Sequence, residues 1–196
     1  MLIDFDSLSG RDAYRLMSQI IVPRPIAWVS TISPTGITNL APFSFFQGVT
    51  SRPPTLLFVP VNDGQGRKKD TVVNIEAIPE FVVNLATAEL VDLVDKSAEV
   101  LPYGISEFEA FGIGAVNSQC IRPPRVRLCP LALECELDRI ITVGEGPFAA
   151  NVVFGRIRVA HVDDALFGKE GELNATILAP LARIGSTYAT VSPLMR

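Results

Sequence analysis

The sequence is poor in the residues that most often carry enzyme chemistry unaided, with one histidine and three cysteines among 196 residues. Cys120, Cys129 and Cys135 form no Cys-x-x-Cys pair, and with only His161 to join them they do not predict a zinc site. Thiols without a disulfide framework are typical of a reducing compartment, so we expect a cytoplasmic protein. No Ser-His-Asp, Cys-His or paired-carboxylate arrangement stands out, so demanding chemistry would need a borrowed cofactor.

Long apolar runs and an excess of basic residues are also lacking. The longest apolar stretches, such as 55–61, are the length of a strand, and residues 1–6 have no signal-peptide pattern, so we expect neither a membrane span nor a targeting segment. The formal net charge of −4 and the pI near 5.1 argue against a nucleic-acid partner. No Gly-x-x-x-x-Gly-Lys run is present and no Gly-x-Gly-x-x-Gly follows an expected strand, which excludes a P-loop and a Rossmann site.

The residues that are present predict one globular domain spanning 1–196, with 48% apolar and 19% charged residues. Hydrophobic periodicity predicts helices over 10–20, 70–78 and 88–98, and a loop-rich region over 102–127 with a helical turn near Glu107. The expected strands are 26–32, 37–41, 55–61, 81–86, 131–143 and 151–162. At least six strands and few helices favour a mainly β fold, a small barrel or sandwich with peripheral helices.

The first two strands form a hairpin that gathers polar groups in an apolar sheet. A four-residue loop would set Ile32 opposite Ile37 and Ser30 opposite Asn39, so that Trp28, Ser30, Asn39 and Ala41 share a face. With Thr31 and the following 42–44, these side chains could present hydroxyls, an amide and backbone donors to a flat heterocycle. The same polar residues also suit a solvated strand face, and both interpretations remain open.

A second polar segment, 67–71, combines basic residues with the start of a helix. Asp70 is placed as the N-cap, and the unpaired N–H groups of a first helical turn attract anions. Lys69 and the hydroxyl of Thr71 would complete a phosphate site. A solvated lysine-rich loop with Asp70 as a simple cap is the alternative.

Two further candidates lie in the last third of the chain. Arg183, Gly185 and Tyr188 could clamp a ring or a phosphate, or they could form an ordinary surface turn near the C-terminus. His161 lies within an apolar strand, where a histidine is either a packed or surface-facing side chain or a direct participant in the chemistry.

The order of these segments resembles the flavin reductase-like family of FMN-binding split-barrel proteins. The resemblance begins with Pro23-Arg24-Pro25-Ile26-Ala27-Trp28-Val29-Ser30-Thr31 and Asn39-Leu40-Ala41-Pro42-Phe43-Ser44-Phe45-Phe46. It continues through Arg52-Pro53-Pro54, Lys69-Asp70-Thr71, Asn74-Ile75, Phe81-Val82-Val83-Asn84-Leu85, Pro123-Pro124-Arg125, 133–135, 155–164 and 180–188. It therefore covers nearly the whole chain.

The resemblance implies a six-stranded Greek-key split β-barrel, usually a homodimer with FMN near the subunit interface. By matching position, the residues along the isoalloxazine and ribityl chain would be Ser30, Thr31, Asn39, Ala41, Pro42, Phe43 and Ser44. Lys69, Asp70 and Thr71 would surround the phosphate, and Arg183, Gly185 and Tyr188 would approach the flavin. His161 would be a nicotinamide contact.

The implied activity is that of a flavin reductase, with hydride passing from NADH or NADPH to the flavin and then to a monooxygenase or another electron acceptor. Two alternatives remain open at this point. One is an FMN-binding electron carrier or sensor without direct NAD(P)H oxidation. The other is a split-barrel protein that serves another cofactor, such as a deazaflavin or pyridoxal phosphate.

Overall fold

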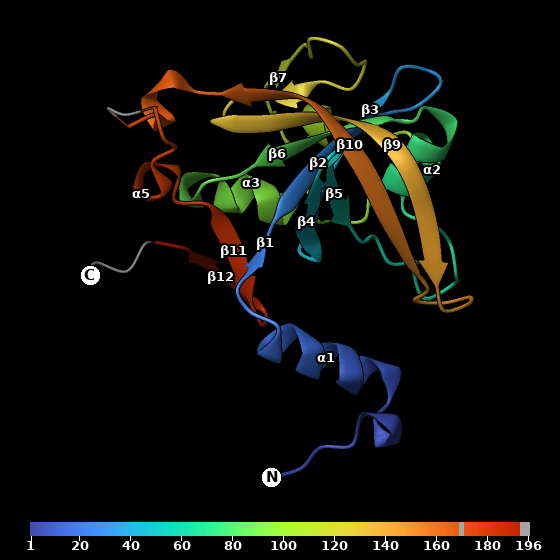
Figure 1. The fold of residues 1–196 in the computed structure, drawn as a ribbon. Coiled ribbons are helices and arrows are strands. Elements are labelled where there is room, and N and C mark those ends of the chain that lie inside the picture. The colour runs from blue at the N-terminus through green and yellow to red at the C-terminus, as the bar shows by residue number, and fades with distance from the viewer. Residues whose placement is uncertain (169–170, 193–196) are drawn as a thin grey trace.

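The computed structural model describes residues 1–168 and 171–192, and a curved antiparallel sheet dominates it (Figure 1). The helices are η1 (Phe5–Ser7), α1 (Gly10–Ile20), α2 (Asp70–Ala77), η2 (Ala88–Leu90), α3 (Val91–Lys96), α4 (Glu107–Ala110), η3 (Asp164–Leu166) and α5 (Ala175–Leu178). The first strands are β1 (Arg24–Pro25), β2 (Ala27–Ile32), β3 (Thr38–Phe43), β4 (Phe46–Ser51), β5 (Pro54–Phe58) and β6 (Glu80–Leu85). The later ones are β7 (Ala115–Val116), β8 (Arg125–Val126), β9 (Leu131–Val143), β10 (Ala150–Val162), β11 (Leu181–Ile184) and β12 (Thr187–Thr190).

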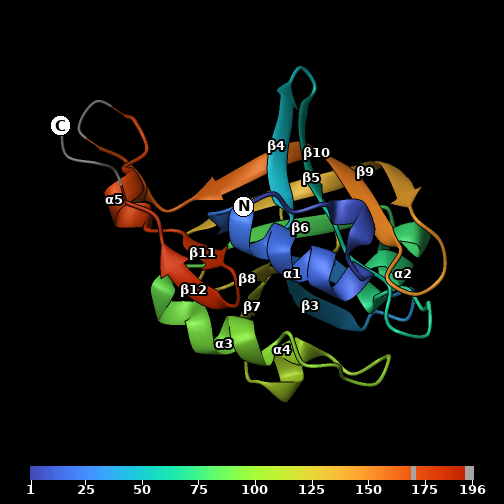
Figure 2. The same cartoon turned by 90° about the horizontal axis from the view of Figure 1, so that it is seen from below.

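The predicted helix 10–20 is confirmed, because its capping signal operates as expected. Ser9 accepts a hydrogen bond from the backbone N–H of Asp12, and its hydroxyl donates to the Asp12 carboxylate at 2.6 Å. The helix lies below the barrel (Figure 1) and crosses in front of it when the molecule is seen from below (Figure 2). It is attached by an edge-to-face contact of Tyr14 with Phe45 and by a hydrogen bond from Gly185 N–H to the Ser18 carbonyl.

The main sheet is mainly responsible for the barrel shape, and its strand order is β3-β2-β6-β9-β10-β5-β4. In the described part of the chain it has seven strands, where six were expected, because 46–51 forms β4 as an exposed edge strand. The 13-residue strands β9 and β10 pair along their whole length. A smaller sheet, β1-β11-β12, joins the N-terminal segment to the C-terminal one.

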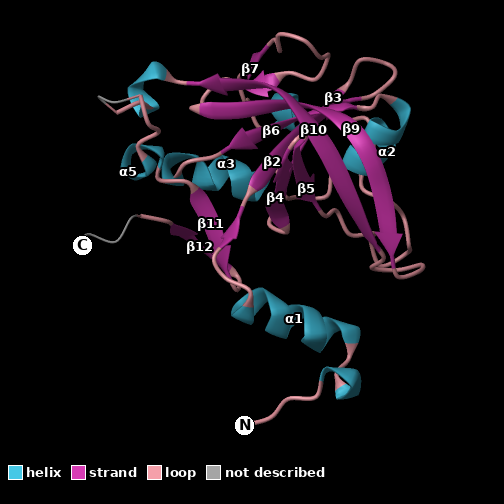
Figure 3. Cartoon of the chain, in the orientation of Figure 1, coloured by secondary structure: helices cyan, strands magenta, loops and turns pink. Residues whose placement is uncertain are grey.

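The two edges of the main sheet, β3 and β4, are connected by only Ser44 and Phe45. A sheet whose opposite edges are two residues apart in sequence must curl, which gives the split barrel in place of a flat sheet (Figure 3). A hydrogen bond from Val59 N–H to the Phe45 carbonyl holds the connection near the end of β5. The polar and aromatic residues around 42–45 therefore lie at the seam of the barrel.

The predicted hairpin register is wrong by one residue. Thr31 pairs with Asn39 and Ser30 with Leu40. Ile37 stays in the loop, where its N–H donates to the Ser33 hydroxyl at 3.0 Å, while Ser33 N–H donates to the Ile37 carbonyl. The longer loop moves Asn39 to the face of Thr31, and leaves Ser30 on the opposite face with Trp28.

Two apolar clusters explain why β2 is buried on both faces. One fills the barrel and consists of Ala27, Val29, Leu56, Phe58, Ile75, Phe81, Val83, Cys135 and Val153. The other lies between the outside of the sheet and the surrounding helices, and consists of Ile26, Trp28, Leu40, Ala86, Leu90, Val94, Phe108, Ile113, Val126 and Leu181. The strand at 27–32 therefore separates two apolar cores, and packing on both faces holds its side chains rigidly.

Three smaller expectations differ from the structure. The strand expected over 55–61 ends at Phe58, because Pro60 has no N–H to continue the ladder. Asp70 is the first helical residue of α2, and Lys69 occupies the N-cap position without a side-chain cap. The region 88–98 forms a short 3-10 turn followed by α3. Among residues 1–168 and 171–192, no helix has the length and apolar character needed to cross a membrane.

Candidate functional site

A cavity of about 840 Å³ opens between α1 and the seam of the barrel, a size typical of small-molecule and cofactor sites. Its wall brings together three segments that are distant in sequence: α1, the seam, and the turn between β11 and β12. The lining residues are Arg11, Asp12, Tyr14, Arg15, Ser18, Arg24, Ile26, Pro42, Phe43, Ser44, Asp95, Ala98, Arg183, Gly185, Ser186 and Tyr188. The predicted site residues 42–44, 183, 185 and 188 thus meet at one cavity.

A smaller cavity of about 120 Å³ adjoins the first, and the two share Pro42, Phe43 and Ala98 as lining residues. It contains the predicted phosphate segment, and its lining residues are Asn39, Ala41, Pro42, Phe43, Lys69, Asp70, Thr71, Ser97, Ala98, Glu99, Val100, Leu101 and Glu107. The two adjoining cavities, together called the groove below, extend from the start of α2 to α1. All but three of the predicted site residues line it, and these three are Ser30, Thr31 and His161.

A buried hydrogen-bond network fixes Asn39 in the wall of the smaller cavity. Its Oδ1 accepts from the hydroxyls of Thr31 and Thr71, at 3.1 and 2.9 Å. Its Nδ2 donates to the carboxylate of Glu107, which also accepts from the Leu40 N–H at 2.8 Å. Asn74 donates to Thr31 at 3.0 Å and extends the network into α2. Because each amide atom of Asn39 has a partner, its orientation is set before any ligand arrives.

Two carboxyl groups in the smaller cavity have altered acidity. Burial raises the pKa of Glu107, although its hydrogen bonds from Leu40 and Asn39 act in the opposite direction. Burial likewise raises the pKa of Asp70, against the attraction of the neighbouring Lys69. Sequence reasoning did not identify Glu107 as a site residue, because its contact with Asn39 spans 68 positions.

Ser30 is placed differently from the expectation drawn from the hairpin. Its side chain is fully buried on the face away from Asn39, donates to the Pro124 carbonyl at 2.5 Å and accepts from Asn84. Asn84 also accepts from the Val126 N–H at 2.8 Å. Ser30 therefore fastens the 117–126 region to the sheet, and its side chain lines neither cavity.

Arg24 is a residue of the larger cavity that the sequence interpretation did not single out, although it lies within the matched segment 23–31. It is 4% exposed, donates to Ser44 Oγ at 2.9 Å and to the Gly185 carbonyl at 2.8 Å, and lies 5.5 Å from the Phe45 ring centroid. Its Nε is buried and has no hydrogen-bond partner. The guanidinium of Arg24 places a buried positive charge in the cavity wall, which favours an anionic or polar group there.

The turn between β11 and β12 supplies the opposite wall of the larger cavity. Arg183 lies across the ring of Tyr188 at 4.3 Å, and the Tyr188 hydroxyl donates to Asp95 at 3.0 Å. Burial and this hydrogen bond raise the pKa of Tyr188. Gly185 adopts a positive φ of 57°, which lets its backbone turn back toward α1.

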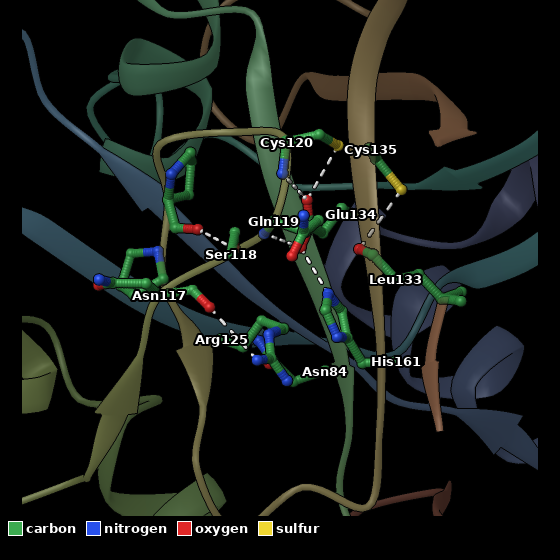
Figure 4. A network of polar contacts seen from close by, with 12 residues as sticks. Asn84, Asn117, Ser118, Gln119, Cys120, Arg125, Leu133, Glu134, Cys135 and His161 are labelled. Carbon is green, nitrogen blue, oxygen red and sulfur yellow. Dashed lines mark hydrogen bonds and ion pairs between the residues drawn. The ribbon is translucent and has the colours of Figure 1, made fainter. Parts of the chain in front are cut away.

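His161 belongs to a separate cluster around Glu134 (Figure 4). Its Nε2 lies 2.6 Å from Glu134 Oε1, and Glu134 also accepts from the N–H groups of Gln119 and Cys120 and from the Cys120 thiol. Glu134 is fully buried, which by itself would raise its pKa, but these donors lower the pKa to about 2. The hydrogen bond to Glu134 raises the pKa of the Cys120 thiol to about 11.

This cluster is consistent with an anchor for the loop 117–124, because a thiol with so high a pKa is a poor nucleophile. None of His161, Glu134 and Cys120 lines either cavity. Within the described residues, no three side chains of His, Cys, Asp or Glu are grouped so that they could hold a metal ion.

The chain resembles several known proteins along nearly its full length. A protein of Aquifex aeolicus without an assigned function is 35% identical over 179 residues, which are 91% of this chain and 89% of that protein. The solved structure of nitrilotriacetate monooxygenase component B from Bacillus cereus is 30% identical, with a TM-score of 0.93 over 100% of this chain and 98% of that one.

The fold is also that of a Shewanella frigidimarina protein described as having a split barrel domain, with a TM-score of 0.84, 19% identity, and coverage of 100% of this chain and 98% of that one. The match to the family described as "Flavin reductase like domain" extends over residues 17–192. It includes the seam residues 42–44, the segment 69–71 and the turn at 183–188, which together line the groove. The chain therefore belongs to the flavin reductase-like domain family.

Proposed function

We propose that this protein is a flavin reductase that binds FMN in the groove formed by the two adjoining cavities and reduces it with NADH or NADPH. The observation that carries the proposal is the order of environments along the two adjoining cavities. One end has an uncapped helix start beside Lys69, the middle is walled by Pro42 and Phe43, and the other end holds Arg24 and Arg183. An elongated ligand with a phosphate at one end and a flat ring in the middle matches this sequence of environments.

The donor set at the start of α2 fits a phosphate group. No side chain caps the first turn of the eight-residue helix, and Lys69 offers a cation. The hydroxyl expected from Thr71 is already donated to Asn39, so Thr71 would offer its backbone N–H instead. A helix N-terminus attracts an anion through its free N–H groups and its dipole. The carboxylate of Asp70 opposes such binding, and the neighbouring Lys69 partly offsets its charge. Lys69 and Thr71 would hold the phosphate of FMN, as the order of segments in the sequence implied.

The residues at the seam fit a flat ring system. Ala41, Pro42 and Phe43 provide apolar contacts, Ser44 is held by Arg24, and Asn39 is oriented by Thr31, Thr71 and Glu107. We propose that Thr31 acts by positioning Asn39. When bound, FMN supplies the ring that accepts hydride from the nicotinamide. The task of the chain is then to hold the reactants together and keep water away.

The decisive experiment is the anaerobic addition of NADH, and separately NADPH, to the FMN-loaded protein. Loss of the flavin absorbance near about 450 nm within seconds is the expected result. Tight FMN binding without oxidation of either nucleotide would refute the reductase and favour an electron carrier or sensor. A purified protein that takes up a deazaflavin or pyridoxal phosphate in preference to FMN would refute the flavin assignment itself.

We also propose a homodimer, supported by an apolar surface that the described chain leaves uncovered. On α1 and its flanks, several large apolar side chains are 37% to 58% exposed: Ile3, Phe5, Tyr14, Met17, Ile20, Ile21 and Val22. Burial of such a patch against a second copy would remove it from water. Light scattering after size-exclusion chromatography should give twice the 21.2 kDa chain mass, and a monomer at micromolar concentration would contradict the proposal.

The partner and the compartment follow from the same reasoning. The relative from Bacillus cereus is named as a component of a monooxygenase, so we propose that reduced flavin passes to a monooxygenase or a similar acceptor. The three free thiols Cys120, Cys129 and Cys135 support a reducing, cytoplasmic setting.

A further inference from the structure

The larger cavity carries an unusual concentration of positive charge for a chain whose formal net charge is −4. Four arginines line it, Arg11 and Arg15 from α1, Arg24 from β1 and Arg183 from β11. Arg11 and Arg15 are one helical turn apart, and Arg24 is directly opposite Arg183 in the β1–β11 pair. Like charges at such positions repel one another and lower stability unless a counter-charge lies between them.

The two acidic residues of this cavity, Asp12 and Asp95, offset only part of that positive charge. Asp12 accepts the Ser9 hydroxyl at 2.6 Å, and Asp95 accepts the Tyr188 hydroxyl at 3.0 Å. In the described ranges, 1–168 and 171–192, none of the four arginines forms an ion pair with a carboxylate. Arg183 is instead stacked on Tyr188.

Arg24 adds a second, independent indication of a ligand. It is almost completely buried in the wall of the cavity, and in the described ranges no carboxylate pairs with it. Burying a cation without a counter-charge is costly, and an anion in the cavity that Arg24 lines would offset that cost. The four arginines differ in exposure: Arg11 and Arg15 are exposed, Arg183 is half-buried and Arg24 is buried.

We propose that Arg11, Arg15, Arg24 and Arg183 bind the diphosphate of the dinucleotide that donates hydride. This inference rests on the proposed function, in which the single phosphate of FMN is bound at the other end of the groove by Lys69 and Thr71. The arginine cluster is thus a second anion site, separated from the first by the wall of Pro42 and Phe43. A diphosphate has two adjacent anionic groups, which suits several planar guanidinium groups better than a single phosphate would.

The location of the cluster explains how the donor would reach the ring. The diphosphate bound beneath α1 would leave the nicotinamide free to extend toward Pro42 and Phe43, where the flavin ring is proposed to lie. Because Arg11 and Arg15 are exposed, they would meet an incoming anion first and increase its rate of association at low salt. The same diphosphate chemistry exists in FAD, so the test must separate donor from flavin.

The binding test uses ADP-ribose as the probe, which carries the diphosphate but no nicotinamide, titrated by calorimetry into the FMN-loaded protein. The double variant Arg11→Ala/Arg15→Ala should bind ADP-ribose at least tenfold more weakly than the wild type, with a smaller dependence on salt. Both residues are exposed, so the fold should tolerate the change. The matched control is Arg139→Ala, an exposed arginine on β9 that lines neither cavity and pairs with Asp138; it should bind as the wild type does.

Kinetics then distinguish the possible sources of the diphosphate. The KM for NADH and NADPH should rise at least tenfold in the double variant. The loss should be much smaller for 1-benzyl-1,4-dihydronicotinamide, a donor without phosphates. If FAD binding weakens and ADP-ribose binding does not, the cluster serves the flavin and the proposal is overturned. Undiminished ADP-ribose binding by the double variant, or no binding by the wild type, also overturns it.

The proposed function can fail separately. If the wild type binds ADP-ribose through Arg11 and Arg15 but oxidises neither nucleotide, the diphosphate site is supported and the reductase activity is refuted. If the wild type oxidises NADH and the double variant has the same KM for NADH, the reductase activity is supported and the diphosphate site is refuted.

Discussion

Replacing Glu134 with glutamine keeps the size of a fully buried side chain and removes its charge. In the native protein both carboxylate oxygens accept: Oε1 from Gln119 N–H at 2.5 Å and from His161 at 2.6 Å, and Oε2 from the N–H and thiol of Cys120 at 2.8 and 3.0 Å. A glutamine has only one accepting end, so its NH₂ must face two of these donors. Each buried donor left without an acceptor costs about 1–3 kcal/mol.

The pKa of Glu134 gives an independent magnitude for the same effect. Its value in the folded protein is about 2, against an ordinary value of 4.5. That difference corresponds to about 3 kcal/mol of stability from the ionised form at pH 7. Because the folded pKa is the lower one, this contribution is complete above pH 4.5 and is lost as the pH falls toward 2. It should decrease to about 2 kcal/mol at a pH of about 3.5.

The assay is urea unfolding of the wild type and of Glu134→Gln at several pH values between about 3.5 and 7, with the free energy taken by linear extrapolation. The variant should be less stable by about 3 kcal/mol at neutral pH, and the deficit should shrink in acid. Glu136→Gln is the matched control on the same strand, since Glu136 is half exposed and pairs with Arg158; it should cost at most about 1 kcal/mol. Equal losses in the two variants, or a deficit independent of pH, would refute the reasoning.

Three further predictions concern other parts of the molecule. Lys69→Ala should weaken FMN binding by about tenfold to a hundredfold and riboflavin binding far less, as measured by flavin fluorescence. The control is Lys68→Ala, which should change neither affinity, because Lys68 pairs with Glu76. Equal weakening of both flavins by Lys69→Ala would contradict the phosphate assignment. Gly155→Ala would place a Cβ 2.2 Å from the ring of Phe81 and should lower the free energy of unfolding by about 1–3 kcal/mol. Adding Phe81→Leu should recover part of the loss. A single variant as stable as the wild type would contradict the close contact of Gly155 with Phe81. Cys120 is exposed but has a pKa of about 11, so at pH 8 it should react with a thiol reagent about a hundredfold more slowly than a thiol of pKa 9.0. The variant Glu134→Gln should accelerate this reaction. Rapid labelling of Cys120 in the wild type would contradict the hydrogen bond from its thiol to Glu134.

Local signals in the sequence were sufficient for the elements that depend on near neighbours. The Ser9–Asp12 cap set the start of α1, and the long alternating segments gave β9 and β10 within one residue of their observed bounds. The hairpin register failed because it depended on a single side chain. Ser33 captures the Ile37 N–H, lengthens the loop and reverses the faces of Ser30 and Thr31. Residue types alone do not reveal which of two loop lengths is formed.

The groove was predicted only in part, for a related reason. Segments 42–44 and 69–71 were recognisable from their order along the chain, and they do line the adjoining cavities. Glu107 and Arg24 were missed because their contacts span large sequence separations, 68 positions to Asn39 and 161 to Gly185. Such pairings depend on how the sheet closes, and neither periodicity nor composition encodes that closure.

The two-residue connection between β3 and β4 has a consequence for the order of folding. The edge strand β3 pairs locally with β2, but this hairpin joins the rest of the sheet only when β2 pairs with β6, across 52 to 56 positions, and β6 with β9. Contacts of such high sequence separation form late, after local hairpins such as β9–β10. The cavities beside Pro42 and Phe43 would then be completed late, when the barrel closes. A ligand bound there would act mainly by slowing the unfolding of the finished barrel, with little effect on how fast it forms.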